Sequence, residues 1–300
     1  MIRLGVIGHR GYPELPAILM SLLAAARGAD AELYAEPDLF DLAHGARKLE
    51  SPDDIDFVIS LGGDGTLLRA VRFLAGAQVP ILGVNLGRLG FLTACGPSEV
   101  EAAVQVLASG KYTVDERMAL RGEAVHADRA QADVHGGVHH VGRWHALNEF
   151  VMHKGGFARV LTVRVTVDGE MLGVYTADGI VVASPTGSTA YSLSAGGPLI
   201  SPSLDSIIIT PVSAHTLAIR PIVVPPNVEV MLEAIEGPDE VLVTVDGQAG
   251  ARFGRGDRLM VRRGSQPVCI VRLPGDSFFD RLRVKLGWGG LPARDEPRKC

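Results

Sequence analysis

The sequence has few cysteines, no long apolar run and no basic tract. Its three cysteines, Cys95, Cys269 and Cys300, are far apart in 300 residues, which matches neither a disulfide framework nor a cysteine metal site and indicates a reducing compartment. No apolar stretch is long enough to span a bilayer. The net charge is -5 and no Lys/Arg cluster is interleaved with aromatics, which argues against a nucleic-acid partner. We therefore expect a cytoplasmic protein with neither a membrane nor a nucleic acid as partner.

Two common nucleotide-binding fingerprints are also missing, namely G-x-x-x-x-G-K-[ST] and G-x-G-x-x-G after a strand. Instead, the apolar run at residues 55–61 leads into Gly62-Gly63-Asp64-Gly65-Thr66. The glycines can adopt positive φ and bring backbone N–H groups close to phosphate oxygens, while Thr66 can cap the next helix. Without a loop lysine, a triphosphate would need backbone dipoles, Mg²⁺ or distant cations, which makes Asp64 a candidate base or metal ligand. The alternative is a turn whose aspartate only caps the helix.

The first third of the chain alternates short apolar runs with helical patterns, and the apolar runs lie at residues 2–7, 31–34, 55–61 and 79–84. This order is typical of an α/β domain with a parallel sheet. Ligands of such sheets bind beyond the carboxyl ends of the strands, so we expect the loops at residues 62–66 and 85–92 to converge on one edge.

After Gly110 the hydrophobic period changes to two, as at residues 118–126 and 241–245. The change predicts a domain boundary near residue 112. We expect residues 1–112 to form the α/β nucleotide-binding domain with the Gly-Asp loop, and residues 113–272 to form a β-rich domain with turns such as Asp168-Gly169.

Residues 178–198 are unusually rich in serine, threonine and glycine. Residues 180–183 predict a strand, Pro185 and Gly187 a tight turn, and Ser188 or Thr189 a helix start. Backbone donors, hydroxyls and the Tyr191 ring would then lie together, and the ring is a natural platform for a purine. The alternative is a buried helix entry packed through small residues, with Tyr191 in the core.

Taken together, these motifs resemble the NAD kinase family. The stretches that carry the resemblance cover most of the chain and lie at residues 62–66, 85–92, 148–149, 178–198, 214–221, 246–248 and 278–283. The Gly-Asp loop alone is shared with phosphofructokinases and with lipid kinases such as the diacylglycerol and sphingosine kinases. Residues 185–198 together with Asn148-Glu149 are much more specific.

The resemblance implies transfer of the γ-phosphoryl group of ATP to the 2′-hydroxyl of the adenosine ribose of NAD. Asp64 would be the catalytic residue, accepting the hydroxyl proton or placing Mg²⁺, and Gly62, Gly63 and Gly65 would form the phosphate loop. No fixed protein metal site is implied, and Mg²⁺ or another divalent cation is expected with ATP. The residues implied to bind NAD are Gly65, Thr66, Asn148, Glu149, Asp178, Thr186, Thr189, Ala190, Tyr191, Ser194 and Gln248.

The resemblance also implies individual roles. Asn148 and Glu149 would hold the adenosine end of NAD, the glutamate through the ribose hydroxyls, for which a carboxylate is a fitting acceptor; the alternative is a polar strand end. Asp178 would accept a hydrogen bond from the nicotinamide carboxamide. The Asp246-Gly247-Gln248 run favours a simple hairpin turn, although the family has residues near its site here.

The resemblance also implies an assembly and a role for the C-terminal segment. Residues 273–300 should return to the first domain, with the aromatics of residues 278–286 in the core. The tail from Ala293 to Cys300 is charged and contains Pro297, so we expect the last residues to be disordered. Homodimers or homotetramers are implied. The competing hypotheses are a lipid kinase, which needs a membrane-docking surface that no segment supplies, and a non-catalytic NAD(P) sensor, which would not need Asp64.

One stretch departs from the family pattern. Five histidines, His126, His135, His139, His140 and His145, lie in a polar segment. No H-E-x-x-H helix face and no nearby cysteine accompany them, so we expect a solvated hairpin tip rather than a metal site.

Overall fold

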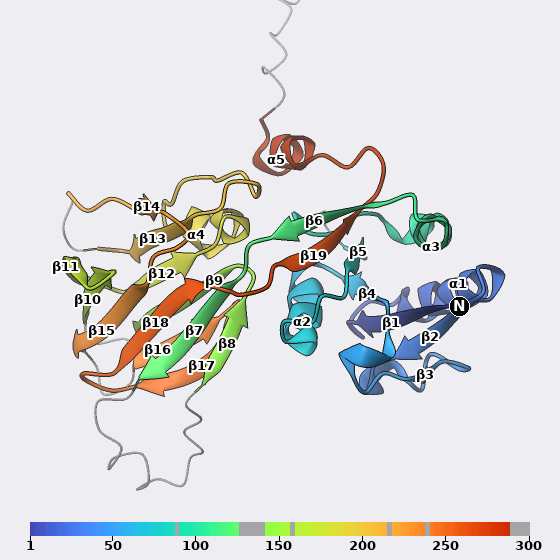
Figure 1. Ribbon diagram of the computed structural model, residues 1–300, viewed down its shortest axis with the longest axis horizontal. Helices are drawn as coiled ribbons and strands as arrows, with labels where there is room; N and C mark the ends of the chain where they lie inside the picture. Colours follow the sequence, from blue (N-terminus) through green and yellow to red (C-terminus); the bar gives the residue numbers. More distant parts are fainter. Residues whose placement is uncertain (88–89, 126–141, 157–159, 215–217, 238–240, 289–300) are drawn as a thin grey trace, which may run out of the picture. The chain divides into compact units, whose positions relative to one another are not determined.

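The computed structural model describes residues 1–87, 90–125, 142–156, 160–214, 218–237 and 241–288. It divides into two compact units (Figure 1), the first built from Met1–Leu74, Val79–Asp115 and Cys269–Cys300, the second from Ala75–Gln78 and Glu116–Val268. The expected disordered tail and the histidine segment, apart from His145 in β8 (Arg143–Ala146), lie outside the described residues.

The first unit contains a seven-stranded sheet of order β3-β2-β1-β4-β5-β19-β6. Its strands are β1 (Ile2–Gly8), β2 (Ala31–Ala35), β3 (Arg47–Lys48), β4 (Phe57–Gly62), β5 (Ile81–Asn85), β6 (Thr113–Arg117) and β19 (Val268–Arg272). Strands β1 to β5 pair in parallel, and so do Ile270 of β19 and Ile81 of β5, so the predicted parallel sheet is confirmed. Strand β19, from late in the chain, lies beside β6 in both ribbon views.

Helices and short turns make up the rest of this unit's regular structure. The helices are α1 (Leu15–Gly28), α2 (Asp64–Leu74), α3 (Val100–Ser109) and α5 (Phe278–Leu286), with short 3₁₀ turns η1 (Pro37–Leu39), η2 (Pro52–Asp54) and η3 (Pro97–Glu99). In α1, Leu15, Leu19 and Leu22 are buried at a spacing that puts them on one stripe of the helix. They join strand residues such as Ile59 in a single core cluster.

Helix α5 differs from the expectation in one respect. Its buried residues are Arg281 and Leu282, and Phe279 is 63% exposed. The prediction that the aromatics of this segment are core is therefore wrong for Phe279. Because the Arg281 guanidinium is held by Asp276 and donates to the Phe91 carbonyl, the buried stripe of the helix is fixed around the arginine, and Phe279 lies outside it.

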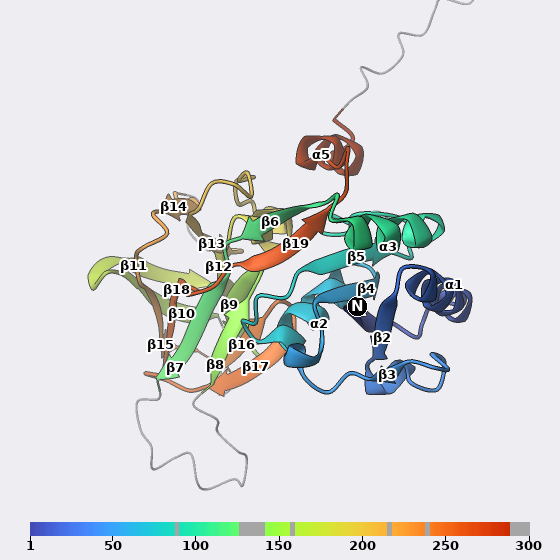
Figure 2. The same ribbon diagram turned by 45° about the vertical axis from the view of Figure 1, so that its right-hand side comes forward.

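The second unit is β-rich, as predicted, and consists of two six-stranded antiparallel sheets, both visible in Figure 2. One has the order β11-β10-β15-β18-β7-β8, with β11 (Glu170–Ala177), β10 (Leu161–Val167), β15 (Val230–Glu236), β18 (Arg258–Arg263) and β7 (Leu120–Val125). The other has the order β14-β13-β12-β9-β16-β17, with β14 (Ile222–Val224), β13 (Ile207–Val212), β12 (Gly179–Ala183), β9 (Glu149–Lys154), β16 (Val241–Val245) and β17 (Gln248–Phe253).

Burial alternates along β10 and β16, which is the pattern of strands with one face in a core. Side chains from both sheets form one cluster around Phe150, which is fully buried. After β12 the chain forms the short helices η5 (Thr186–Thr189) and α4 (Tyr191–Ser194).

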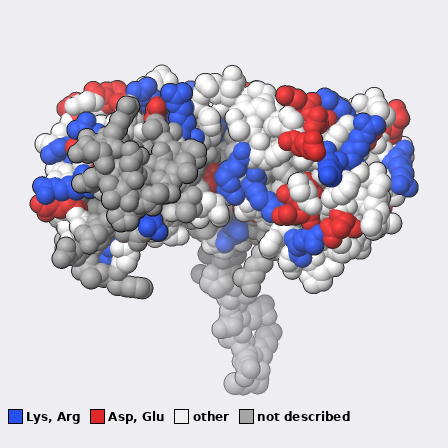
Figure 3. All heavy atoms as spheres, turned by 90° about the horizontal axis from the view of Figure 1, so that it is seen from below, with Lys and Arg blue, Asp and Glu red and all other residues white. Residues whose placement is uncertain are grey.

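Within the described residues, no helix is both long and apolar enough to cross a membrane. On the face drawn in Figure 3, Lys/Arg and Asp/Glu side chains lie among one another in each unit.

The core of the second unit allows a direct stability test. Replacing Phe150 with alanine removes a fully buried ring, and the cavity should lower the free energy of unfolding by about 3–5 kcal/mol. The matched control, Phe279→Ala, removes an exposed ring and should change it by less than about 0.5 kcal/mol. Urea denaturation of both variants checks the prediction, and equal losses would show that the two rings are packed alike.

Candidate active site

The glycine-rich loop after β4 differs in detail from the expectation. Helix α2 begins at Asp64 itself, so Thr66 lies in its first turn and does not cap it. None of the loop glycines has a positive φ. Gly62 is needed for a different reason, because a Cβ there would lie 2.2 Å from the Thr66 hydroxyl oxygen. The glycine therefore makes room for the buried threonine, rather than providing a left-handed turn.

The Asp64 carboxylate joins two loops. Oδ2 accepts a hydrogen bond from the Phe91 N–H at 2.8 Å, and Oδ1 accepts one from the Leu92 N–H at 3.0 Å. The predicted convergence of loops 62–66 and 85–92 on one sheet edge is thereby confirmed. The carboxylate's bonds run to the second loop rather than to its own helix, and each oxygen retains capacity for another donor. Gly90 permits this approach, because a Cβ there would lie 2.0 Å from Asp64 Oδ1.

Two residues beside this edge were not expected. The Tyr12 hydroxyl oxygen would lie 3.2 Å from a Cβ at Gly87 and 4.0 Å from one at Gly63, so the ring lies against both glycine loops. Arg281 donates to the Phe91 carbonyl at 2.9 Å, while the Phe91 N–H donates to Asp64. Both residues are distant in sequence from the loops they touch, and no local spacing signals such contacts.

In the second unit, Ser184 holds the backbone that carries Asn148 and Glu149. The Ser184 N–H donates to the Asn148 carbonyl at 2.8 Å, and its hydroxyl donates to the Leu147 carbonyl at 2.5 Å. Gly187 packs equally closely, because a Cβ there would lie 2.1 Å from the Asn148 carbonyl oxygen. The two stretches that made the resemblance specific are therefore in direct contact.

The Asp246-Gly247 pair forms the predicted hairpin turn between β16 and β17, with φ of 48° and 72°. The turn does more than reverse the chain. The Asp246 carboxylate is buried and accepts hydrogen bonds from the N–H groups of Leu147, Asn148 and Glu149 at 2.8–3.1 Å. The sequence did not indicate this contact, because nothing in a hairpin motif identifies a partner about a hundred residues earlier.

Glu149 is an unusual buried acid. It is 4% exposed, and its Oε2 has no hydrogen-bond partner. Burial raises its pKa to about 8, the Asp246 charge raises it as well, and a hydrogen bond from the Tyr191 N–H lowers it. A solvated polar strand end does not explain such a group. An unpartnered acceptor beside Tyr191 fits a ligand hydroxyl.

The serine- and threonine-rich stretch uses many of its hydroxyls internally. Ser188 bonds to Ile200 and Ser192 to Thr210. The buried Thr186 hydroxyl accepts from the buried Arg117 guanidinium at 3.3 Å, and the Thr189 hydroxyl donates to the Thr186 carbonyl. These bonds make the segment a rigid platform.

Only some side chains of the serine- and threonine-rich stretch reach solvent. Tyr191 is 43% exposed and Ser194 is also exposed, while Ala190 is partly buried. The alternative with Tyr191 in the core is therefore wrong.

The remaining predicted residues lie in the same unit. Asp178, just before β12, pairs with Lys154 of β9 at 2.6 Å. Gln248 begins β17 and is exposed. Across the part of the chain that the structure describes, no group of three or more His, Cys, Asp and Glu could hold a metal ion.

Known proteins resemble this chain over nearly its whole length. The family models for the ATP-NAD kinase N-terminal and C-terminal domains match residues 30–112 and 147–273. A NAD kinase of Gemmatimonas aurantiaca is 53% identical over 294 residues, which cover 98% of this chain and 99% of that protein. The chain belongs to the NAD kinase family. A NAD kinase of Moorella thermoacetica is 45% identical over 239 residues, 80% of this chain and 73% of its own.

Solved structures of NAD and NADH kinases share the fold. Yeast NADH kinase complexed with NADH has a TM-score of 0.86 at 23% identity, over 97% of this chain and 88% of that one. A NAD kinase from Archaeoglobus fulgidus in complex with ATP has a TM-score of 0.73 at 26% identity, over 96% and 100% of the two chains. The resemblance inferred from the motifs is confirmed.

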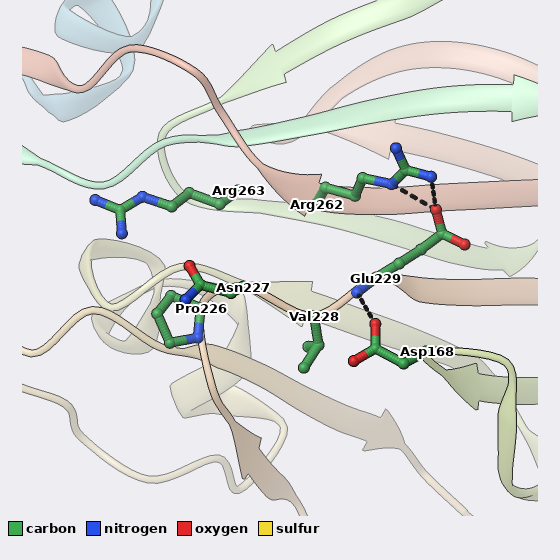
Figure 4. A pocket seen from close by; sticks show the side chains of 7 residues that line it. All are labelled: Asp168, Pro226, Asn227, Val228, Glu229, Arg262 and Arg263. Atoms are coloured by element: carbon green, nitrogen blue, oxygen red, sulfur yellow. Dashed lines mark hydrogen bonds and ion pairs between the residues drawn. The ribbon is translucent and has the colours of Figure 1, made fainter.

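Two clefts are lined by residues other than Asp64 and Glu149, although the first-unit cleft includes Asn85 and Arg281 from the stretches that carry the resemblance. A cleft of about 430 Å³ in the first unit is lined by Asn85, Thr93 and Arg281 among others. One of about 580 Å³ in the second unit, drawn in Figure 4, is lined by Asp168, Glu229 and charged neighbours that pair with one another. Neither is lined by Asp64 or Glu149. Asp64 and Glu149 are better candidates for ligand binding than either cleft, because their oxygens have the chemistry that a ligand needs.

Glu149 predicts how stability depends on pH. Its pKa is raised from the ordinary value of 4.5 to about 8 in the folded protein, so the folded state keeps a proton that the unfolded chain releases. Its contribution to the free energy of unfolding is present below about pH 4.5 and falls as pH rises towards 8. Glu149→Gln should remove this dependence, and urea denaturation at about pH 5 and about pH 8 measures it. Parallel pH profiles for the two proteins would contradict the raised pKa.

Proposed function

We propose that the protein transfers the γ-phosphoryl group of ATP to the 2′-hydroxyl of the adenosine ribose of NAD, giving NADP and ADP. The observation that carries the proposal is the Asp64 carboxylate at the meeting point of two glycine-containing loops, at the carboxyl ends of parallel strands. This is where α/β folds place the reacting ends of nucleotides. Identity of 53% to a NAD kinase over nearly the full chain supports the choice of substrate.

In the proposed reaction Asp64 accepts the proton of the ribose 2′-hydroxyl as the oxygen forms its bond to the γ-phosphorus, and the bond from that phosphorus to the β,γ-bridging oxygen breaks. In the Gly62-Gly63-Gly65 phosphate loop, Gly65 is exposed and Gly63 half-buried, so their backbone would meet the phosphates, with the buried Gly62 and Thr66 behind them. Most of the rate enhancement in such transfers comes from positioning and charge stabilisation. The two loop N–H groups hold the Asp64 side chain still, which favours a fixed position for the acceptor.

The second unit would hold NAD through residues that its backbone contacts bring together. The unpartnered Glu149 oxygen accepts from a ribose hydroxyl, with Asn148 beside it, and the exposed Tyr191 ring stacks on the purine. Asp178 accepts from the nicotinamide carboxamide. The remaining residues proposed to line the pocket are Thr186, Thr189, Ala190, Ser194 and Gln248.

ATP would bring a divalent cation such as Mg²⁺, which supplies charge neutralisation between the phosphates. A single acid, Asp64, lies at the loop, which fits a cation held mainly by phosphate oxygens and water. We also propose a cytoplasmic location, from the sparse cysteines, and a homodimer or homotetramer, from the family resemblance. Light scattering coupled to size-exclusion chromatography measures the assembly.

The decisive test is NADP formation from NAD with ATP and Mg²⁺, in wild type and Asp64→Asn. The variant should lose turnover by about 10²-fold or more, because an amide cannot accept the proton. Its affinity for NAD should stay within a few fold, because the amide does not remove the contacts of Glu149. Repeating the assay with NADH and with polyphosphate identifies the preferred acceptor and donor.

A matched variant separates chemistry from loop positioning. Gly90→Ala places a methyl group against Asp64 Oδ1 and so shifts the second loop while keeping the carboxylate. It should reduce turnover less than Asp64→Asn does. Equal losses would show that Asp64 acts only by holding the loop, and a wild type that binds NAD without forming NADP would favour the sensor hypothesis.

A further inference from the structure

Asp246 and Ser184 are the hydrogen-bond partners of every backbone N–H and C=O group in residues 147–149. The N–H groups of Leu147, Asn148 and Glu149 all donate to the Asp246 carboxylate. The Leu147 and Asn148 carbonyls accept from Ser184, and the Glu149 carbonyl accepts from the Asp246 N–H at 3.0 Å. Leu147 and Asn148 lie between β8 and β9, outside either strand, so sheet pairing does not supply partners for their N–H groups. The conformation of this segment therefore depends on Asp246.

The same unit contains an ordinary Asp-Gly turn for comparison. Asp168 and Gly169 join β10 to β11 with φ of 50° and 82°, nearly the geometry of Asp246 and Gly247. Asp168 is exposed and accepts one backbone hydrogen bond, from Glu229 at 2.8 Å (Figure 4). A hairpin turn thus needs neither burial nor three donors. The additional contacts of Asp246 serve the segment that carries Asn148 and Glu149.

This arrangement places two acids close together. Asp246 is 6% exposed and Glu149 4%, and the Asp246 charge is the second cause, after burial, of the raised pKa of Glu149. The Tyr191 N–H faces the Glu149 carboxyl and opposes both effects. A pair of buried acids is unfavourable for folding alone, which points to a role in binding.

We propose that Asp246 is a positioning residue of the nucleotide site, which fixes the backbone from which Asn148 and Glu149 extend to hold the adenosine ribose. The inference rests on the proposed function. Asp246 acts through its neighbours, since its carboxylate oxygens are already bonded to the backbone of residues 147–149. Asn148 and Glu149 then need no reorganisation when the ribose binds, which favours affinity.

The test compares Asp246→Asn with the matched control Asp168→Asn in steady-state NADP formation. In Asp246→Asn one side-chain oxygen can still accept, but the new NH₂ group faces a backbone donor. The KM for NAD should rise about tenfold, as expected when a buried donor loses its acceptor, with kcat within about threefold. Asp168→Asn should leave both constants unchanged. A fall in kcat at constant KM would show a merely structural role and overturn the proposal.

The pH profile gives a second readout. Glu149 faces the Asp246 charge and the Tyr191 N–H, so removing that charge lowers its pKa. The pH at which the KM for NAD changes should therefore move to lower pH in Asp246→Asn and stay in place in Asp168→Asn. In a Glu149→Gln background, Asp246→Asn should produce no such shift, and a shift that persists there would contradict the assigned coupling.

Hydrogen exchange decides the positioning without reference to activity. In the wild type the amides of residues 147–149 should be protected, and in Asp246→Asn they should exchange at least about tenfold faster, while the amides of β12 keep their rates. Unprotected amides in the wild type, or unchanged rates in the variant, would overturn the proposal even if the variant folds poorly. A wild type that forms no NADP would instead overturn the proposed function, and exchange would still test the contacts of Asp246.

Discussion

Irregular backbone at the ends of buried strands must find hydrogen-bond acceptors, and in this protein aspartate carboxylates provide them. Asp64 receives the N–H groups of Phe91 and Leu92, and Asp246 receives those of residues 147–149. Each contact joins segments that are distant in the sequence. An unpaired buried N–H is costly, so these two acids determine the shape of the loops around them.

The same constraint relates structure to chemistry. A carboxylate already fixed by backbone donors keeps one position and still has lone pairs for a substrate, which is the situation of Asp64. In the second unit two acids have separate roles. Asp246 accepts the hydrogen bonds of the backbone N–H groups, and Glu149 keeps an unpartnered oxygen. The raised pKa of Glu149 follows from that division, since burial and the Asp246 charge act on it together. Asp246 thus orders the backbone, and the neighbouring Glu149 provides the capacity to bind a ligand.

Much of the fold followed from local pattern. Apolar runs alternating with helical periods identified the parallel sheet, and the change to a period of two identified the β-rich unit, because both periods reflect which face of an element is buried. The hairpin at Asp246-Gly247 followed from turn chemistry. The exposed Phe279 did not, because the buried stripe of α5 is set by Arg281 and its distant partner Phe91. The loop glycines could have adopted positive φ, but none of Gly62, Gly63 and Gly65 does, and Gly62 is needed for space beside Thr66.

By itself, the sequence determined the parallel sheet, the β-rich unit, the two motif stretches and the family, since these depend on residues close together in the chain. Only the tertiary structure decided that Asp64 binds the second loop, that Ser184 and Asp246 together enclose residues 147–149, and that β19 lies beside β6 in the first unit's sheet. The physical reason is that these contacts satisfy backbone groups across large separations. Which carboxylate reaches which N–H depends on how strands are ordered in space, and no local spacing records that order.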